Sequence, residues 1–157
     1  MMRSLTAGEW TGLSSGLAEA LRAAGAEPRI QPMAHPGARI ASLWRGHTAI
    51  LTRGNVIWWA DAPADISQGN PQGMAVLQHE LHHVLEYTTG ILSAWRYLTN
   101  RHNWSYRWVF EEGRPWSALG AEQRAVVAER LWLAERGLAP NHEIETLRRL
   151  LPWSDVY

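Results

Sequence analysis

Cysteine is absent from the 157 residues of the sequence. This absence excludes disulfide bonds and thiolate metal sites, so histidine and carboxylate are the only strong metal ligands that the chain offers. Long apolar runs are missing too. No segment approaches the roughly 18 residues of a membrane span. The N-terminal stretch MMRSLTAGEWTGLSSG also lacks the apolar centre of a secretory signal. We therefore expect a cytoplasmic protein without a membrane span.

An excess of charge of one sign is also lacking. Fifteen basic and fifteen acidic residues cancel, and neither sign forms a long block. Because nucleic acids and anionic membranes attract basic patches, neither is expected as a partner. Phenylalanine is nearly absent, with one residue, whereas tryptophan occurs ten times. This balance favours a core built on large rings with polar N–H edges over a tryptophan-lined ligand groove.

The first part of the chain predicts one helix and a short strand. The length is that of an ordinary domain, so we expect a single domain over residues 1–157. Apolar residues recur every fourth position over residues 5–24, which predicts an amphipathic helix ended by Gly25. Three prolines follow and exclude regular helix there, although a short strand fits residues 29–33.

A β-hairpin is predicted next. Two apolar runs, at residues 47–51 and 56–60, flank a turn that contains Gly54-Asn55. A Gly-Asn pair between β-prone runs is a hairpin signal. The second run, VIWWA, is apolar on both faces, so we expect it to be covered on both sides.

The second half of the chain is mainly helical. Asn70 is a favoured helix cap, Pro71 suits the first helical position, and Gly90 is a natural terminator. Further helical segments are predicted over residues 91–98, 119–136 and 142–150, and a loop with one or two short extended pieces over 99–116. Several helices beside a few strands predict an α+β fold.

The stretch QHELHHVLEY at residues 78–87 carries the chemistry. Residues four apart on a helix lie on one face, about 6 Å along the axis, so His79 and His83 can converge on one ion. Glu80 lies about 100° around the helix, where it reaches a water on that ion more easily than the ion itself. This spacing is typical of metal-dependent hydrolases, in which two histidines hold zinc and the glutamate takes a proton from water.

A third ligand must come from elsewhere in the chain. Glu86 lies about 10 Å along the helix from His79, too far to share an ion with it, and is expected in an outer shell or at the surface. The longer motif with a third histidine fails, because Glu86 and Thr89 occupy its positions. A glutamate from a later helix is therefore required. Glu122 and Glu129 share the apolar face of the helix predicted over residues 119–136, and periodicity leaves both open.

Several segments resemble a family of small zincin-type domains. These are LTAGEW, GNVIWWAD, VLQHELHHVLEYTTG, YRW and WSALGAEQRAVVAE, within residues 5–135. The family comprises Vgr-related, metallopeptidase-like domains associated with bacterial type VI secretion and contractile injection systems. The resemblance implies a minimal zincin fold, with a small sheet whose edge strand lies beside the active-site helix. His82 departs from the family, where many relatives carry a small or apolar residue.

The resemblance also implies a ligand set. The family's downstream Glu-Gln-x-Ala segment matches Glu122 to Ala125, which favours Glu122 over Glu129 as the third ligand. We therefore predict a zinc metallopeptidase in which His79, His83 and Glu122 bind Zn²⁺ and Glu80 activates water.

The remaining parts of the predicted mechanism concern the substrate, a protein or peptide. Tyr106 and His102 are the candidate donors to the developing oxyanion. An extended substrate could pair with the strand over residues 56–59 by main-chain hydrogen bonds, given a free edge there.

A non-catalytic role is the alternative. In it, the metal pins two helices together and a tryptophan-rich surface binds a secretion-apparatus or toxin protein. Under either role, the resemblance leaves open export by an injection system. Structural zinc sites usually have four protein ligands, so His102 or Asp155 in contact with the metal would favour this alternative. The other histidines, His35, His47 and His142, are expected to be surface or capping residues.

Overall fold

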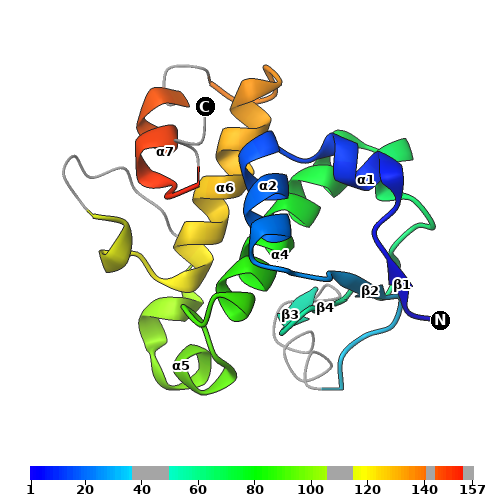
Figure 1. Cartoon of the computed structure of the whole chain (residues 1–157), viewed down its shortest axis with the longest axis horizontal. Coiled ribbons are helices and arrows are strands. Elements are labelled where there is room, and N and C mark those ends of the chain that lie inside the picture. Colours follow the sequence, from blue (N-terminus) through cyan, green and yellow to red (C-terminus); the bar gives the residue numbers. More distant parts are fainter. Residues whose placement is uncertain (37–49, 106–114, 141–143, 154–157) are drawn as a thin grey trace.

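The structure is a computed structural model that describes residues 1–36, 50–105, 115–140 and 144–153. Its helices and small mixed sheet confirm the predicted α+β fold (Figure 1). The strands are β1 (Arg3–Ser4), β2 (Arg29–Gln31), β3 (Leu51–Arg53) and β4 (Val56–Trp58). The α-helices are α1 (Ala7–Gly12), α2 (Ser15–Ala23), α4 (Pro71–Thr88), α5 (Ala94–Thr99), α6 (Ala121–Glu135) and α7 (Ile144–Leu150). Short 3₁₀ turns are η1 (Ile66–Gln68), η2 (Arg101–Trp104) and η3 (Trp116–Ala118).

The four strands form one sheet in the order β1-β2-β4-β3. The central pair, β2 and β4, is parallel, and the two outer pairs are antiparallel. Ile30 and Ile57 lie side by side in the central pair, and both side chains are fully buried. The sheet therefore contributes its centre to the hydrophobic core.

The hairpin is confirmed, with a shift in its first strand. Arg53 pairs with Val56 across a two-residue turn, and Gly54 has the left-handed φ of 59° that such turns favour. The first strand runs over Leu51–Arg53 and so ends two residues later than predicted; residues 47–49 of the predicted run lie outside the described part of the chain.

The expectation of a free edge on residues 56–59 is wrong. Strand β4 pairs with β2 on one side and with β3 on the other, so its hydrogen-bonding edges are already used. Of the described strands, β1 and β3 are the outer ones, and β3 packs beside α4. An added extended chain would therefore have to pair with a different strand.

Helix α4 is the centre of the molecule. It begins as predicted, with the Asn70 side chain accepting a hydrogen bond from Gln72 N at 2.8 Å, and Gly90 follows its end with a φ of 76°. In Figure 1 it crosses the fold diagonally, with the sheet on one side and α6 and α7 on the other. Every residue from Leu77 to Glu86 is buried. The polar side chains among them therefore need partners inside the protein.

The predicted helix over residues 5–24 is two helices. Leu13 is extended, with φ −69° and ψ 163°, and its side chain is buried in the core. The break leaves the Gly12 carbonyl free to accept a hydrogen bond from Trp132 Nε1 on α6 at 2.8 Å. Ser14 meanwhile accepts one from Gln78 of α4. Long-range contacts thus outweigh the local helical pattern. The end at Gly25 is confirmed, with a φ of 67°.

The C-terminal helices follow the prediction, with shorter bounds. Helix α5 starts at Ala94, three residues later than expected, because the Ser93 side chain caps it through Arg96 N. The described part of residues 99–116 contains 3₁₀ turns instead of the expected extended pieces. Among the described helices, none is long and apolar enough to cross a membrane.

The tryptophans are divided between core and surface. Trp132 and Trp153 are buried, as expected for core rings, whereas Trp95 and Trp104 are exposed at 75% and 46%. The core explanation therefore covers only part of the tryptophan content.

Candidate metal centre

Two histidines of α4 meet one glutamate of α6. Nε2 of His79 lies 3.1 Å from Oε2 of Glu122, and Nε2 of His83 lies 3.3 Å from the same oxygen. The candidate ligand atoms of the three residues all lie within 4.8 Å of one another. All three residues are buried, with exposures of 7%, 5% and 4%. This group could hold a metal ion.

The donor set and its spacing fit a small divalent cation. Bonds of 2.0–2.1 Å to a tetrahedral ion place neighbouring ligand atoms about 3.4 Å apart. The 3.1 and 3.3 Å separations from Oε2 of Glu122 are close to that value, and the ligand atoms of the two histidines lie within 4.8 Å of each other. Two imidazole nitrogens and one carboxylate oxygen suit several first-row metals, so the geometry alone does not name the ion.

The charge at the site also favours a cation. Burial lowers the pKa of His79, but hydrogen bonds with Glu122 and Glu129 outweigh this effect and raise it from 6.5 to about 10. Burial raises the pKa of Glu122, yet its bonds with His79 and His83 hold it well below 4.5. The carboxylates thus stabilise positive charge here, and a metal ion would replace the proton on His79.

Glu129 contacts the site from outside. Its Oε2 lies 3.2 Å from Nδ1 of His79, the ring nitrogen that faces away from Glu122. The two glutamates that periodicity left open therefore differ in position, and only Glu122 faces both histidines. Nδ1 of His83 is buried and has no hydrogen-bond partner within the described residues.

The chain matches no protein-family model, no curated protein and no solved structure. The resemblance to zincin-type domains therefore stays a prediction. The candidate metal centre stands on its own geometry.

Glu80 is held by the neighbouring strand. Thr52 Oγ1, on β3, donates a hydrogen bond to Oε2 of Glu80 at 2.7 Å. The Glu80 side chain is mostly buried, with 8% of the residue exposed. The contact orients one carboxylate oxygen, and among the described contacts the other oxygen has no hydrogen bond. Nothing in the sequence singles out Thr52, because no spacing rule links it to the helix.

Tyr97 is a second residue that the sequence motif does not reveal. Its hydroxyl, on α5, donates a hydrogen bond to Oε1 of Glu122 at 2.6 Å. Both carboxylate oxygens of Glu122 are therefore engaged, one by the histidines and the other by this phenol.

A buried ion pair also joins helices α4 and α6. Arg124 Nη2 on α6 lies 3.1 Å from Glu86 Oε2 on α4, and Arg124 Nε bonds the other oxygen of Glu86. His82 Nε2 lies 3.3 Å from Glu86 Oε1, and Trp153 Nε1 approaches His82 Nδ1 at 3.4 Å. Glu86 is only 1% exposed, so the surface alternative is wrong. Its described partners, Arg124 and His82, are not candidate ligands, so its expected place in an outer shell stays a prediction.

Other predicted residues are not tested by the structure. Tyr106, His47, His142 and Asp155 lie outside the described residues, and so does the side chain of His102, whose backbone belongs to η2. His35 packs edge-on against Trp58 with ring centroids 5.0 Å apart and is not part of the group of candidate ligands.

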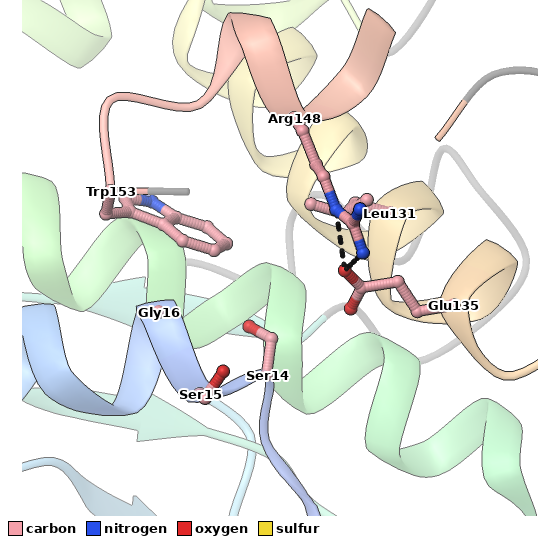
Figure 2. Close-up of a pocket in the computed structure, with 7 residues that line it drawn as sticks. All are labelled: Ser14, Ser15, Gly16, Leu131, Glu135, Arg148 and Trp153. Atoms are coloured by element: carbon pink, nitrogen blue, oxygen red, sulfur yellow. Dashed lines mark hydrogen bonds and ion pairs between the residues drawn. The ribbon is translucent and has the colours of Figure 1, made fainter. Parts of the chain in front are cut away.

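A pocket of about 330 Å³ lies elsewhere, between α2, α6, α7 and the segment after α7 (Figure 2). Its charged residues, Arg148 and Glu135, form an ion pair at 3.1 Å. The other lining residues are Ser14, Ser15, Gly16, Leu131 and Trp153. None of the candidate ligands or Glu80 lines this pocket, so it offers no part of the metal chemistry.

Proposed function

We propose that this protein is a zinc-dependent hydrolase of peptide bonds, acting on a protein or peptide substrate. The observation that carries the proposal is the convergence of His79, His83 and Glu122, with Glu80 on the same helix as the histidines. Zinc suits two imidazoles and one carboxylate in a chain without thiols. Association with an injection system rests on the sequence resemblance alone.

The residues divide the work of hydrolysis. A zinc ion held by the three ligands would polarise the scissile carbonyl and make a water molecule more acidic. Glu80 accepts a proton from the attacking water and later passes it to the leaving amine. Thr52 restrains Oε2 of Glu80 at 2.7 Å, and within the described contacts Oε1 has no hydrogen bond, so we assign that proton to Oε1.

The number of ligands distinguishes an enzyme from a structural metal site, and the two candidates for a fourth ligand, His102 and Asp155, lie outside the described side chains. Catalytic zinc sites usually have three protein ligands and one open position, whereas structural sites have four. Over the residues that the structure describes, the group contains three.

A second candidate is a metal-stabilised interaction module that binds a secretion-apparatus or toxin protein. The exposed apolar side chains on and around α5 favour it: Trp95 is 75% exposed, Leu98 63% and Trp104 46%. In this alternative the protein binds zinc but hydrolyses no peptide.

Zinc content and hydrolysis of a denatured protein, measured together, test the proposal. Glu80→Gln should keep its zinc and lose about 10²- to 10⁴-fold in kcat, because it removes only the proton acceptor. Glu145→Gln, the same change at an exposed position of α7, is the matched control and should behave as wild type. Equal activity in Glu80→Gln and wild type would contradict the proposal, and a zinc-loaded wild type without activity would favour the interaction module.

A further inference from the structure

Glu122 uses its two carboxylate oxygens for different partners. Oε2 faces the two imidazole nitrogens at 3.1 and 3.3 Å, while Oε1 accepts the Tyr97 hydroxyl at 2.6 Å. An O–H···O⁻ bond of this length is charge-assisted and stronger than a neutral one. With Glu122 buried, little solvent competes for it.

Tyr97 is held in place by contacts outside the metal centre. Asn103 is buried and bridges two elements: its Nδ2 donates to Arg96 O at 2.9 Å, and its Oδ1 accepts from Ala121 N, the first residue of α6, at 3.1 Å. Trp104 Nε1 also donates to the Tyr97 carbonyl at 2.9 Å. Helix α5 is thus fixed against the start of α6, and the phenol is fixed against Glu122.

Whether Glu122 binds a metal through one oxygen or through both determines how many coordination positions stay open. A carboxylate can bind a metal through one oxygen or through both. With His79 and His83, a one-oxygen Glu122 fills three positions of a four-coordinate ion, whereas a two-oxygen Glu122 fills all four. Hydrolysis needs the fourth position for water or substrate.

We propose that Tyr97 is a positioning residue that keeps Glu122 bound to the metal through Oε2 alone, and so preserves an open coordination position. This inference rests on the proposed function, because it assumes a metal at the three ligands. The role of Tyr97 differs from that of Glu129, which contacts Nδ1 of His79 and does not contact the Glu122 carboxylate in the described contacts.

Substitution Tyr97→Phe tests the inference by removing only the hydroxyl. Cobalt(II) replaces zinc as the probe, because its visible absorption depends on coordination number and geometry. We expect cobalt binding to weaken roughly 10- to 100-fold, the usual effect of losing an outer-shell partner, and the visible spectrum to change as Glu122 Oε1 reaches the ion. A folded Tyr97→Phe protein with the wild-type cobalt spectrum would overturn the inference.

Thr99→Val is the matched control. It removes a hydroxyl from the same short helix, where Thr99 Oγ1 bonds only back to Trp95 O at 2.8 Å in the described contacts and faces no metal ligand. Its cobalt spectrum and affinity should equal those of wild type. If Tyr97→Phe does not fold, X-ray absorption on zinc-loaded wild type decides instead: a one-oxygen carboxylate supports the inference and a two-oxygen carboxylate overturns it.

These readouts separate the inference from the proposed function. If wild type binds cobalt but hydrolyses no peptide, the proposed peptidase function is wrong. The cobalt spectrum of Tyr97→Phe still decides whether Tyr97 controls the coordination by Glu122. If the Glu122→Ala variant binds metal as tightly as wild type, the assigned metal centre is wrong, and the inference about Tyr97 fails with it.

Discussion

Glu129 approaches His79 from the side opposite Glu122, with its Oε2 3.2 Å from Nδ1 of the ring. A carboxylate behind a ligating histidine fixes the ring orientation and the position of its proton, and strengthens the other nitrogen as a ligand. The two glutamates therefore predict different phenotypes, although they lie on the same face of α6. Glu122→Ala should abolish specific zinc binding, whereas Glu129→Gln should weaken it by roughly 10- to 100-fold.

Competition with a chelator measures both effects. Glu135→Gln, on the same helix but paired with the distant Arg148, is the control and should retain wild-type affinity. If Glu129→Gln lost zinc as fully as Glu122→Ala, Glu129 would be a ligand, and the assignment of the two roles would be wrong.

Thr52 provides a test of how Glu80 acts. Thr52→Val keeps the shape of the side chain and removes the hydrogen bond to Glu80 Oε2. A hydrogen bond to a charged group contributes about 1.5–3 kcal/mol, so we expect kcat to fall at least roughly tenfold. Zinc content should stay at the wild-type level, since Thr52 does not contact the three ligands. Steady-state kinetics beside metal analysis make the measurement; loss of zinc with unchanged kcat per bound zinc would contradict the proposed role.

The buried pair of Arg124 and Glu86 should contribute to stability. Removing one partner leaves the other as an unpaired buried charge, so Arg124→Ala should lower the free energy of unfolding by about 3–5 kcal/mol. Arg148→Ala breaks an exposed pair and should cost less than about 1 kcal/mol. Urea unfolding of the metal-free variants provides the comparison, and equal losses in both would show that burial of the pair adds nothing.

Lowering the pH should weaken the contribution of the same ion pair to stability. Burial raises the pKa of Glu86, but the contacts with His82 and Arg124 outweigh it and lower that pKa from 4.5 to about 2. A lowered pKa in the folded state means that Glu86 contributes its full stability above pH 4.5 and loses it as the pH falls towards 2. Urea unfolding of metal-free wild type should therefore weaken over this range more steeply than that of Glu86→Gln. Parallel curves would exclude this contribution.

Local rules explain which features the sequence predicts. The start of α4 follows from Asn70 and Pro71, and its end from Gly90, because caps act within a few residues. The convergence of His79 and His83 follows from helical spacing. These features need no knowledge of the rest of the fold.

Other features depend on contacts between distant segments. The break at Leu13 exists because Gly12 and Ser14 bond to α6 and α4, and the inner position of β4 depends on its pairing with β2. Thr52 and Tyr97 reach the site from separate elements, and no sequence spacing relates them to the motif on α4.

The choice between Glu122 and Glu129 shows the same limit of sequence patterns. Two turns of helix separate them on one face, so periodicity treats them alike. Only the way in which α6 packs on α4 distinguishes the carboxylate that faces both histidines from the one behind His79.

The most direct test of the metal centre is a crystal structure of the zinc-loaded protein with anomalous scattering at the zinc edge. The account predicts one peak about 2.0–2.2 Å from Nε2 of His79, Nε2 of His83 and Oε2 of Glu122. A peak that omits Glu122, or no bound zinc at these side chains, would contradict it.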